Sequence, residues 1–188
     1  MGSVGTTDFR GGLKIEIDGS PYAIVDYQHV KPGKGGAFVR TRLRNLLTGN
    51  SLDRTFRSGE KFDLADIVER TGQYLYQQDE RFHFMDTENY EQFAIPPDQV
   101  GSAKDFLKEE MVVQLVFYKG TAIGVTLPNF VELKITETAP GIRGDTATGG
   151  TKLAKVETGG VVKVPLFLEE GTRIKIDTRT SAYIERVS

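Results

Sequence analysis

Short runs of alternating apolar and polar residues follow one another along almost the whole chain, and turn-forming residues separate them. Residues 13–18 alternate and end in an aspartate–glycine pair, and residues 37–47 alternate before a threonine–glycine–asparagine turn. This period is typical of short β-strands that bury one face. The pattern therefore predicts an all-β fold.

One segment departs from the strand pattern. Pro96 and Pro97 end a predicted strand, and the sequence from Asp98 onward places Val100 and Phe106 at helical spacing. Proline at the start of a helix is tolerated because its missing N–H would be unpaired there. We predict a single helix at this position.

The predicted strands form three groups, in residues 1–65, 66–128 and 129–188. Each group has the size of a small SH3-like or OB barrel of about 60 residues. We therefore expect three small β domains with these boundaries.

Composition excludes several classes of protein. The 188 residues include no cysteine, so disulfide frameworks and thiolate metal sites are excluded. No apolar run reaches the roughly 20 residues of a membrane helix, and the polar start does not have the pattern of a signal peptide. We expect a cytoplasmic protein without a membrane partner.

Charge is distributed unevenly. The net charge is −2, yet the segment from Lys31 to Arg57 carries seven basic residues against a single acid, Asp53. The basic residues are Lys31, Lys34, Arg40, Arg42, Arg44, Arg54 and Arg57. Alternation places Arg40, Arg42 and Arg44 on one strand face, which is either solvated or meets a partner. Such a patch would orient the molecule on a polyanion.

The side chains available for catalysis are few. The chain has two histidines, His29 and His83, and neither has a serine, aspartate or metal-ligand partner at an informative spacing. The Gly33-Lys34-Gly35 sequence does not match a P-loop, which needs Ser or Thr after Gly-Lys. We predict no enzyme activity, no catalytic residue, no metal site and no cofactor.

A glycine-rich loop between two predicted strands holds a single lysine, Lys34. Its loop neighbours are Lys31, Pro32, Gly33, Gly35 and Gly36. One interpretation is a hairpin turn with glycines for positive φ and a lysine for solubility. The other is a functional tip, because a tight turn needs fewer glycines and a tip lysine can enter a narrow, negatively charged space. Both interpretations stay open on turn chemistry alone.

Two features of the last third also allow alternatives. The loop around Gly144, Asp145 and Thr146 is either a variable connection or a source of small donors to a nucleic-acid backbone. Tyr183 and Arg186 are either a core and a surface residue, or a stacking and phosphate-contacting pair.

Several segments, taken in order, resemble the elongation factor P family, which is related to archaeal and eukaryotic initiation factor five A. They are HVKPGKGGAFVR, RTRLRNLLTG, PNFVEL, GDTATGGTK, KVPLFLEEG and IKIDTR. The resemblance covers essentially the whole chain. It implies an N-terminal KOW/SH3-like domain followed by two OB domains, in an L-shaped, tRNA-like arrangement.

The resemblance also implies a function. A member of this family is expected to bind the 70S ribosome, through rRNA and ribosomal proteins, between the P and E sites. The Lys34 loop would position the CCA end of the P-site peptidyl-tRNA and stimulate peptide-bond formation at consecutive prolines. A lysine-modifying enzyme could extend Lys34, and the factor would act as a monomer.

Residue roles follow from the same resemblance. Tyr183 and Arg186 match positions that contact tRNA, and Gly144, Asp145 and Thr146 match a loop that reaches toward the E-site codon and small subunit. The arginines Arg40, Arg42, Arg44, Arg54 and Arg57 are expected to bind RNA phosphates.

Two other classes of function stay open. The first is a general KOW/OB RNA-binding module without a defined ribosomal site, which would tolerate the loss of Lys34. The second is an enzyme or sugar-binding β protein, which the fold class alone would permit.

Overall fold

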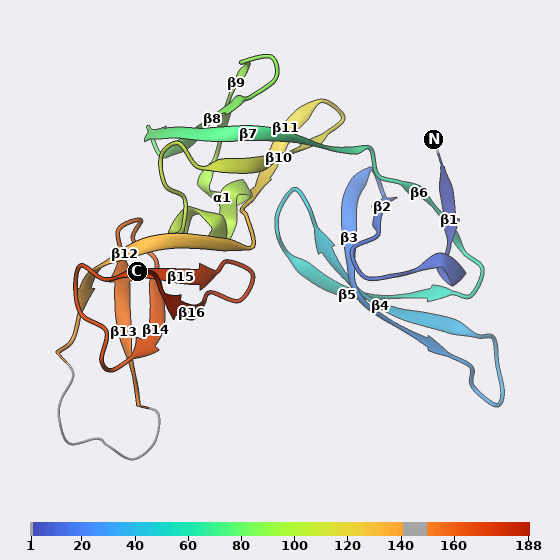
Figure 1. Ribbon diagram of the computed structural model, residues 1–188. Helices are drawn as coiled ribbons and strands as arrows, with labels where there is room; N and C mark the ends of the chain where they lie inside the picture. The colour runs from blue at the N-terminus through green and yellow to red at the C-terminus, as the bar shows by residue number, and fades with distance from the viewer. Residues whose placement is uncertain (1, 141–149) are drawn as a thin grey trace. The chain divides into compact units, whose positions relative to one another are not determined.

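The computed structural model describes residues 2–140 and 150–188. Contacts divide the chain into two compact units, one containing residues up to Arg70 with Leu115–Gly124, the other Thr71–Gln114 with Val125–Ser188. Three antiparallel sheets make up most of the chain (Figure 1). The all-β expectation is confirmed.

The first sheet has six strands in the order β1-β6-β2-β3-β4-β5. Their bounds are β1 Ser3–Gly5, β2 Lys14–Ile17, β3 Ser20–Val30, β4 Phe38–Asn45, β5 Ser51–Arg57 and β6 Lys61–Leu64. A short 3-10 helix, η1 Thr6–Asp8, follows β1. The long strands β3 and β4 form the hairpin that carries the Lys34 loop.

The core of this sheet forms from the apolar positions of its alternating strands. Ile15, Ile24, Val39 and Leu43 are at most 1% exposed. Three phenylalanine rings close the core, with Phe56 and Phe62 centroids 4.7 Å apart and Phe9 packed against both. Because these side chains fix the inner face, the alternate residues must point to solvent.

The second sheet has five strands in the order β11-β10-β7-β8-β9. Their bounds are β7 Ile67–Gln78, β8 Arg81–Asp86, β9 Gln92–Ile95, β10 Val112–Tyr118 and β11 Thr121–Thr126. Lys119 and Gly120 have φ of 47° and 81°, the left-handed conformations of a two-residue hairpin turn. Strands β10 and β11 are therefore joined as a hairpin.

The predicted helix is much shorter than its spacing suggested. The α-helix α1 spans Pro97–Val100, and a 3-10 helix, η2 Gly101–Asp105, replaces its continuation. Gly101 has φ of 61° and ψ of −140°, a conformation outside the helical region that glycine adopts without strain. None of the helices in the described part of the chain has the length and apolar character that a membrane crossing needs.

The third sheet has five strands in the order β14-β13-β12-β15-β16. Their bounds are β12 Phe130–Thr138, β13 Thr151–Val156, β14 Val161–Pro165, β15 Arg173–Asp177 and β16 Ala182–Arg186. Leu133, Val164, Ile174 and Ile176 are fully buried in its core. The three sheets use residues 3–64, 67–126 and 130–186. The domain boundaries at residues 65 and 128 stay a prediction.

Candidate nucleic-acid interface

The loop between β3 and β4 is exposed from Lys31 to Gly36. Gly35 has φ of 111°, which favours glycine. Gly33 and Gly36 do not have a positive φ, and a Cβ atom at either would meet no heavy atom of the described residues within 4 Å. The conformation of this loop therefore requires glycine at position 35 and not at positions 33 or 36.

The lysines of this loop are unpaired. Within residues 2–140 and 150–188, neither Lys31 nor Lys34 makes a hydrogen bond or an ion pair through its side chain. Both ammonium groups can therefore meet an anion of another molecule without breaking a contact of their own.

Strand β4 presents three arginines on one face, as the sequence predicts. Arg40, Arg42 and Arg44 are exposed and alternate with the buried residues Val39, Thr41 and Leu43. Arg40 lies over the Phe38 ring at 5.7 Å. Neither Arg40 nor Arg44 has an ion-pair partner among the described residues, so these two guanidinium groups remain free to bind phosphate.

Arg42 differs from its two neighbours because carboxylates flank it. The strand register places Asp26 of β3 and Asp53 of β5 on either side of Arg42. Its Nε donates to Asp53 Oδ1 at 2.9 Å and its Nη2 to Oδ2 at 3.4 Å. This pairing raises the pKa of Arg42 and lowers the pKa of Asp53, and Asp26 adds a smaller attraction for Arg42. The positive charge of Arg42 is therefore largely balanced by carboxylates of the protein itself.

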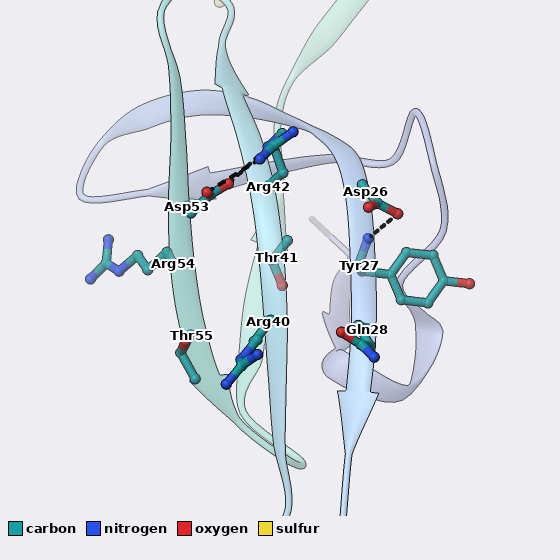
Figure 2. Close-up of a pocket in the computed structure, with 9 residues that line it drawn as sticks. All are labelled: Asp26, Tyr27, Gln28, Arg40, Thr41, Arg42, Asp53, Arg54 and Thr55. Atoms are coloured by element: carbon teal, nitrogen blue, oxygen red, sulfur yellow. Dashed lines mark hydrogen bonds and ion pairs between the residues drawn. The ribbon is translucent and has the colours of Figure 1, made fainter.

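A shallow hollow of about 400 Å³ lies along this arginine face (Figure 2). Its lining residues are Asp26, Tyr27, Gln28, Arg40, Thr41, Arg42, Asp53, Arg54 and Thr55. Carboxylate and guanidinium groups, together with amide and hydroxyl groups, line this hollow. Such a lining can bind a polar, charged surface and has no reactive pair for chemistry.

The five predicted RNA-binding arginines do not share one face. Register places Arg57 opposite Phe38, on the same side as Arg40. Arg54 points to the other side, where its Nη1 donates to Asp18 at 3.3 Å and its guanidinium lies over Phe56 at 5.6 Å. The arginine face therefore consists of Arg40, Arg42, Arg44 and Arg57, and Arg54 lies outside it.

The candidate residues of the last third are separated from this face in sequence and sheet. Tyr183 is half-buried and packs against the core of the third sheet, whereas Arg186 is exposed near the end of β16. Gly144, Asp145 and Thr146 lie outside the described residues.

The histidines make aromatic contacts. The His83 ring stacks on Tyr76, with centroids 4.7 Å apart, and His29 meets the edge of Tyr27. Among residues 2–140 and 150–188, no three His, Cys, Asp or Glu side chains form a group that could hold a metal ion.

Comparison with known proteins identifies the family. Family models for the KOW-like domain, the OB domain and the C-terminal part of elongation factor P match residues 5–62, 67–125 and 131–186. Elongation factor P of Caldanaerobacter subterraneus subsp. tengcongensis is 56% identical over 180 residues, which is 96% of this chain and 97% of that protein. The Moorella thermoacetica protein is 54% identical over 183 residues, or 97% and 99%.

The chain belongs to the elongation factor P family. It is therefore a translation elongation factor rather than an enzyme, as expected. The KOW-like and OB matches also confirm the predicted fold class. A solved structure, the eukaryotic translation initiation factor 5A from Methanococcus jannaschii, matches with a TM-score of 0.54 and 26% identity. That match covers 64% of this chain and 89% of the other.

The sequence does not show which acids pair with the arginines of this chain. Asp53 is the one acid of the basic segment, and alternation within a single strand does not predict its contact with Arg42. Asp26 and Asp18 lie outside that segment. Alternation gives the face of each residue within a strand, but only the register between strands shows which residues are opposite.

Proposed function

We propose that this factor binds the ribosome between the P and E sites and positions the CCA end of the P-site peptidyl-tRNA through the Lys34 loop. In this role it stimulates peptide-bond formation at consecutive prolines. The ring of proline restricts its backbone and makes its nitrogen a constrained nucleophile. A factor that orders the peptidyl end would contribute positioning and would not need a catalytic group.

The observation that carries this proposal is the surplus of glycine around an unpaired lysine. Gly33 and Gly36 are not needed for the loop conformation, and a Cβ atom at either meets nothing. A glycine that the free protein does not need is explained by a second molecule whose atoms approach the backbone closely. Lys34, with no partner of its own among the described residues, would then donate to RNA oxygens.

The arginine face supports the same proposal. Arg40 and Arg44, which have no ion-pair partner among the described residues, offer their guanidinium groups on one side of the hairpin that carries Lys34. Contacts to phosphates position a protein on RNA without reading its sequence. Such contacts along tRNA would hold the loop in place while Lys34 reaches the reacting end.

A reconstituted translation reaction tests the proposal. A message with consecutive proline codons and a proline-free message are translated without the factor, with the factor, and with its Lys34→Ala variant. We expect rescue on the proline message alone and no rescue by Lys34→Ala. Lys163→Ala is the matched control, because Lys163 is an exposed strand lysine on β14 without an ion-pair partner among the described residues.

Gly36→Ala is the sharper variant. It should fold like the wild type, since the added methyl group meets nothing, and it should lose part of the rescue because it obstructs the close approach of RNA. Full rescue by both Lys34→Ala and Gly36→Ala would favour a general RNA-binding module and would overturn the proposed role of the loop.

The state of Lys34 needs its own measurement. We propose that a lysine-modifying enzyme extends this side chain, since the loop is exposed and the ammonium group has no partner in the part of the chain that the structure describes. Mass spectrometry of the protein from its native host should show added mass on the peptide that contains Lys34. An unmodified peptide, together with rescue by unmodified protein, would contradict the modification and leave the positioning role intact.

A further inference from the structure

The exposed ion pair between Arg42 and Asp53 occupies the centre of the face that is proposed to meet RNA. Side chains of Arg42 and Asp53 are 60% and 71% exposed, so water and salt reach both groups. Exposed pairs of this kind add little to stability. The pair therefore has little structural value, and its position in the arginine face calls for a different explanation.

Two carboxylates compete with phosphate for Arg42. Asp53 already accepts from Nε and Nη2, the edge through which arginine binds phosphate bidentately. Asp26, opposite Arg42 in the register, adds further negative charge, although its Oδ1 also accepts from the Tyr27 backbone N–H. An RNA phosphate can reach this edge of Arg42 only if Asp53 gives up its hydrogen bonds.

We propose that Asp53, assisted by Asp26, is a specificity determinant that withholds Arg42 from RNA in general and releases it only on the cognate partner. A loosely held RNA gains too little from one phosphate contact to replace a carboxylate that is already bound. A partner fixed by its other contacts places a phosphate beside Arg42 at high local concentration, and Asp53 can then turn to solvent. This inference rests on the proposed function, because it assumes that the arginine face binds RNA.

The chemistry distinguishes Arg42 from its neighbours. Arg40 lies opposite Gln28 and Thr55, and Arg44 lies opposite Ala23 and Ser51. None of these four neighbours carries a charge. These two arginines therefore supply the attraction for any polyanion. The Nε–Nη2 edge of Arg42 adds to affinity only after Asp53 leaves, so this edge contributes to selectivity.

Binding of a generic single-stranded RNA 12-mer, followed by fluorescence anisotropy over a range of salt concentrations, tests the inference. Asp53→Asn should tighten binding several-fold and make the slope of log K against log salt steeper by about 0.7, the value of one further phosphate contact on a single strand. Arg42→Gln should weaken this binding slightly, because the charge of Asp53 is then uncompensated, but should leave the slope unchanged because no phosphate contact is lost. The double variant Arg42→Gln/Asp53→Asn should return to the wild-type slope.

Asp63→Asn on β6 is the matched control, since Asp63 is exposed and makes the same change in net charge away from Arg42. If Asp53→Asn behaves like Asp63→Asn, or if its effect persists in the double variant, the inference is wrong. Thermal unfolding of each variant checks that all of them fold.

Ribosome binding by the same variants completes the test. Arg42→Gln should weaken binding to the ribosome by more than it weakens binding to the 12-mer, and Asp53→Asn should lower the ratio of ribosome to 12-mer affinity. An equal effect of Arg42→Gln on both partners would overturn the inference. Loss of the Lys34-dependent proline rescue concerns a different readout, so failure of the proposed function can be told apart from failure of this inference.

Discussion

Two arginine–aspartate pairs, one in the first sheet and one in the third, use the same two-point geometry in opposite surroundings. Arg42 reaches across strands to Asp53, whose side chain is 71% exposed. Arg179 folds back on Asp177, whose side chain is only 11% exposed, with Nε–Oδ1 and Nη2–Oδ2 distances of 3.0 and 2.7 Å. Burial of the carboxylate decides whether the arginine can leave its aspartate for another anion or is held in place as part of the fold.

Asp177, the buried carboxylate of the two pairs, accepts more hydrogen bonds than Asp53. Asp177 also accepts from the backbone N–H of Arg179 at 2.9 Å, which closes the turn between β15 and β16. These hydrogen bonds lower the pKa of the Asp177 carboxyl, with the Arg179 side chain as the largest cause. The guanidinium in turn lies over Phe130, 5.5 Å from the ring centroid. Release of the Arg179 guanidinium would leave a buried carboxylate without its opposite charge, which is costly.

The largest expected effect comes from removing that carboxylate. Asp177→Ala should lower the thermal midpoint by about 5 °C or more, because the turn loses its acceptor and Arg179 loses its partner. Asp53→Ala, measured by the same thermal unfolding, should change the midpoint by less than about 2 °C. Equal shifts for the two variants would break the distinction between a fixed and an exchangeable pair.

The second expectation concerns acid. Both carboxyls have a pKa lowered by an arginine, so each stabilises the fold above its unfolded pKa, and this contribution is lost as the pH falls through the folded value. Stability should therefore decline below about pH 4. Asp177→Asn should flatten this decline, whereas Asp53→Asn should follow the wild type, because water and salt screen the exposed pair. Urea unfolding between about pH 2 and pH 6 measures both.

A smaller effect is expected on the inner face of β4. Thr41 is 2% exposed, and its Oγ1 has no hydrogen-bond partner among the described residues. Thr41→Val replaces this hydroxyl by a methyl group and should stabilise the protein by about 1 kcal/mol, or roughly 2–4 °C in the thermal midpoint. A lower midpoint would show that the hydroxyl is satisfied in solution. Binding of the RNA 12-mer should stay unchanged, since Arg42 points to the opposite face.

The smallest effect is expected for Arg42→Ala. Its midpoint should stay within about 1 °C of the wild type, and the difference should vanish as salt is added. A double-mutant cycle of Arg42 and Asp53 should give a coupling close to zero, against a clear coupling for Arg179 and Asp177. A salt-independent coupling at Arg42 would mean that this pair is structural after all.

The sequence predicts those features that depend only on neighbouring residues in the same strand. The alternation of β4 depends only on its period, so the arginine face and the buried positions Val39 and Leu43 could be predicted. The opposition of Asp26 to Arg42 could not, because a β-bulge between Ile24 and Asp26 shifts the register. The α-helix after Pro97 is shorter than the apolar spacing predicts, since this spacing does not show that Gly101 leaves the helical region.

The open space around Gly36 also makes the loop accessible to chemical labelling. The chain contains no cysteine, so Gly36→Cys would introduce its sole thiol, two residues from Lys34 and free of steric conflict with the described residues. A photoactivated cross-linker attached there would become covalently joined to whatever molecule lies against the loop. A fluorophore attached to the same sulfur atom would report when a partner molecule binds to the loop. The same position can therefore be used both to identify the molecules that contact the loop and to measure how fast they bind.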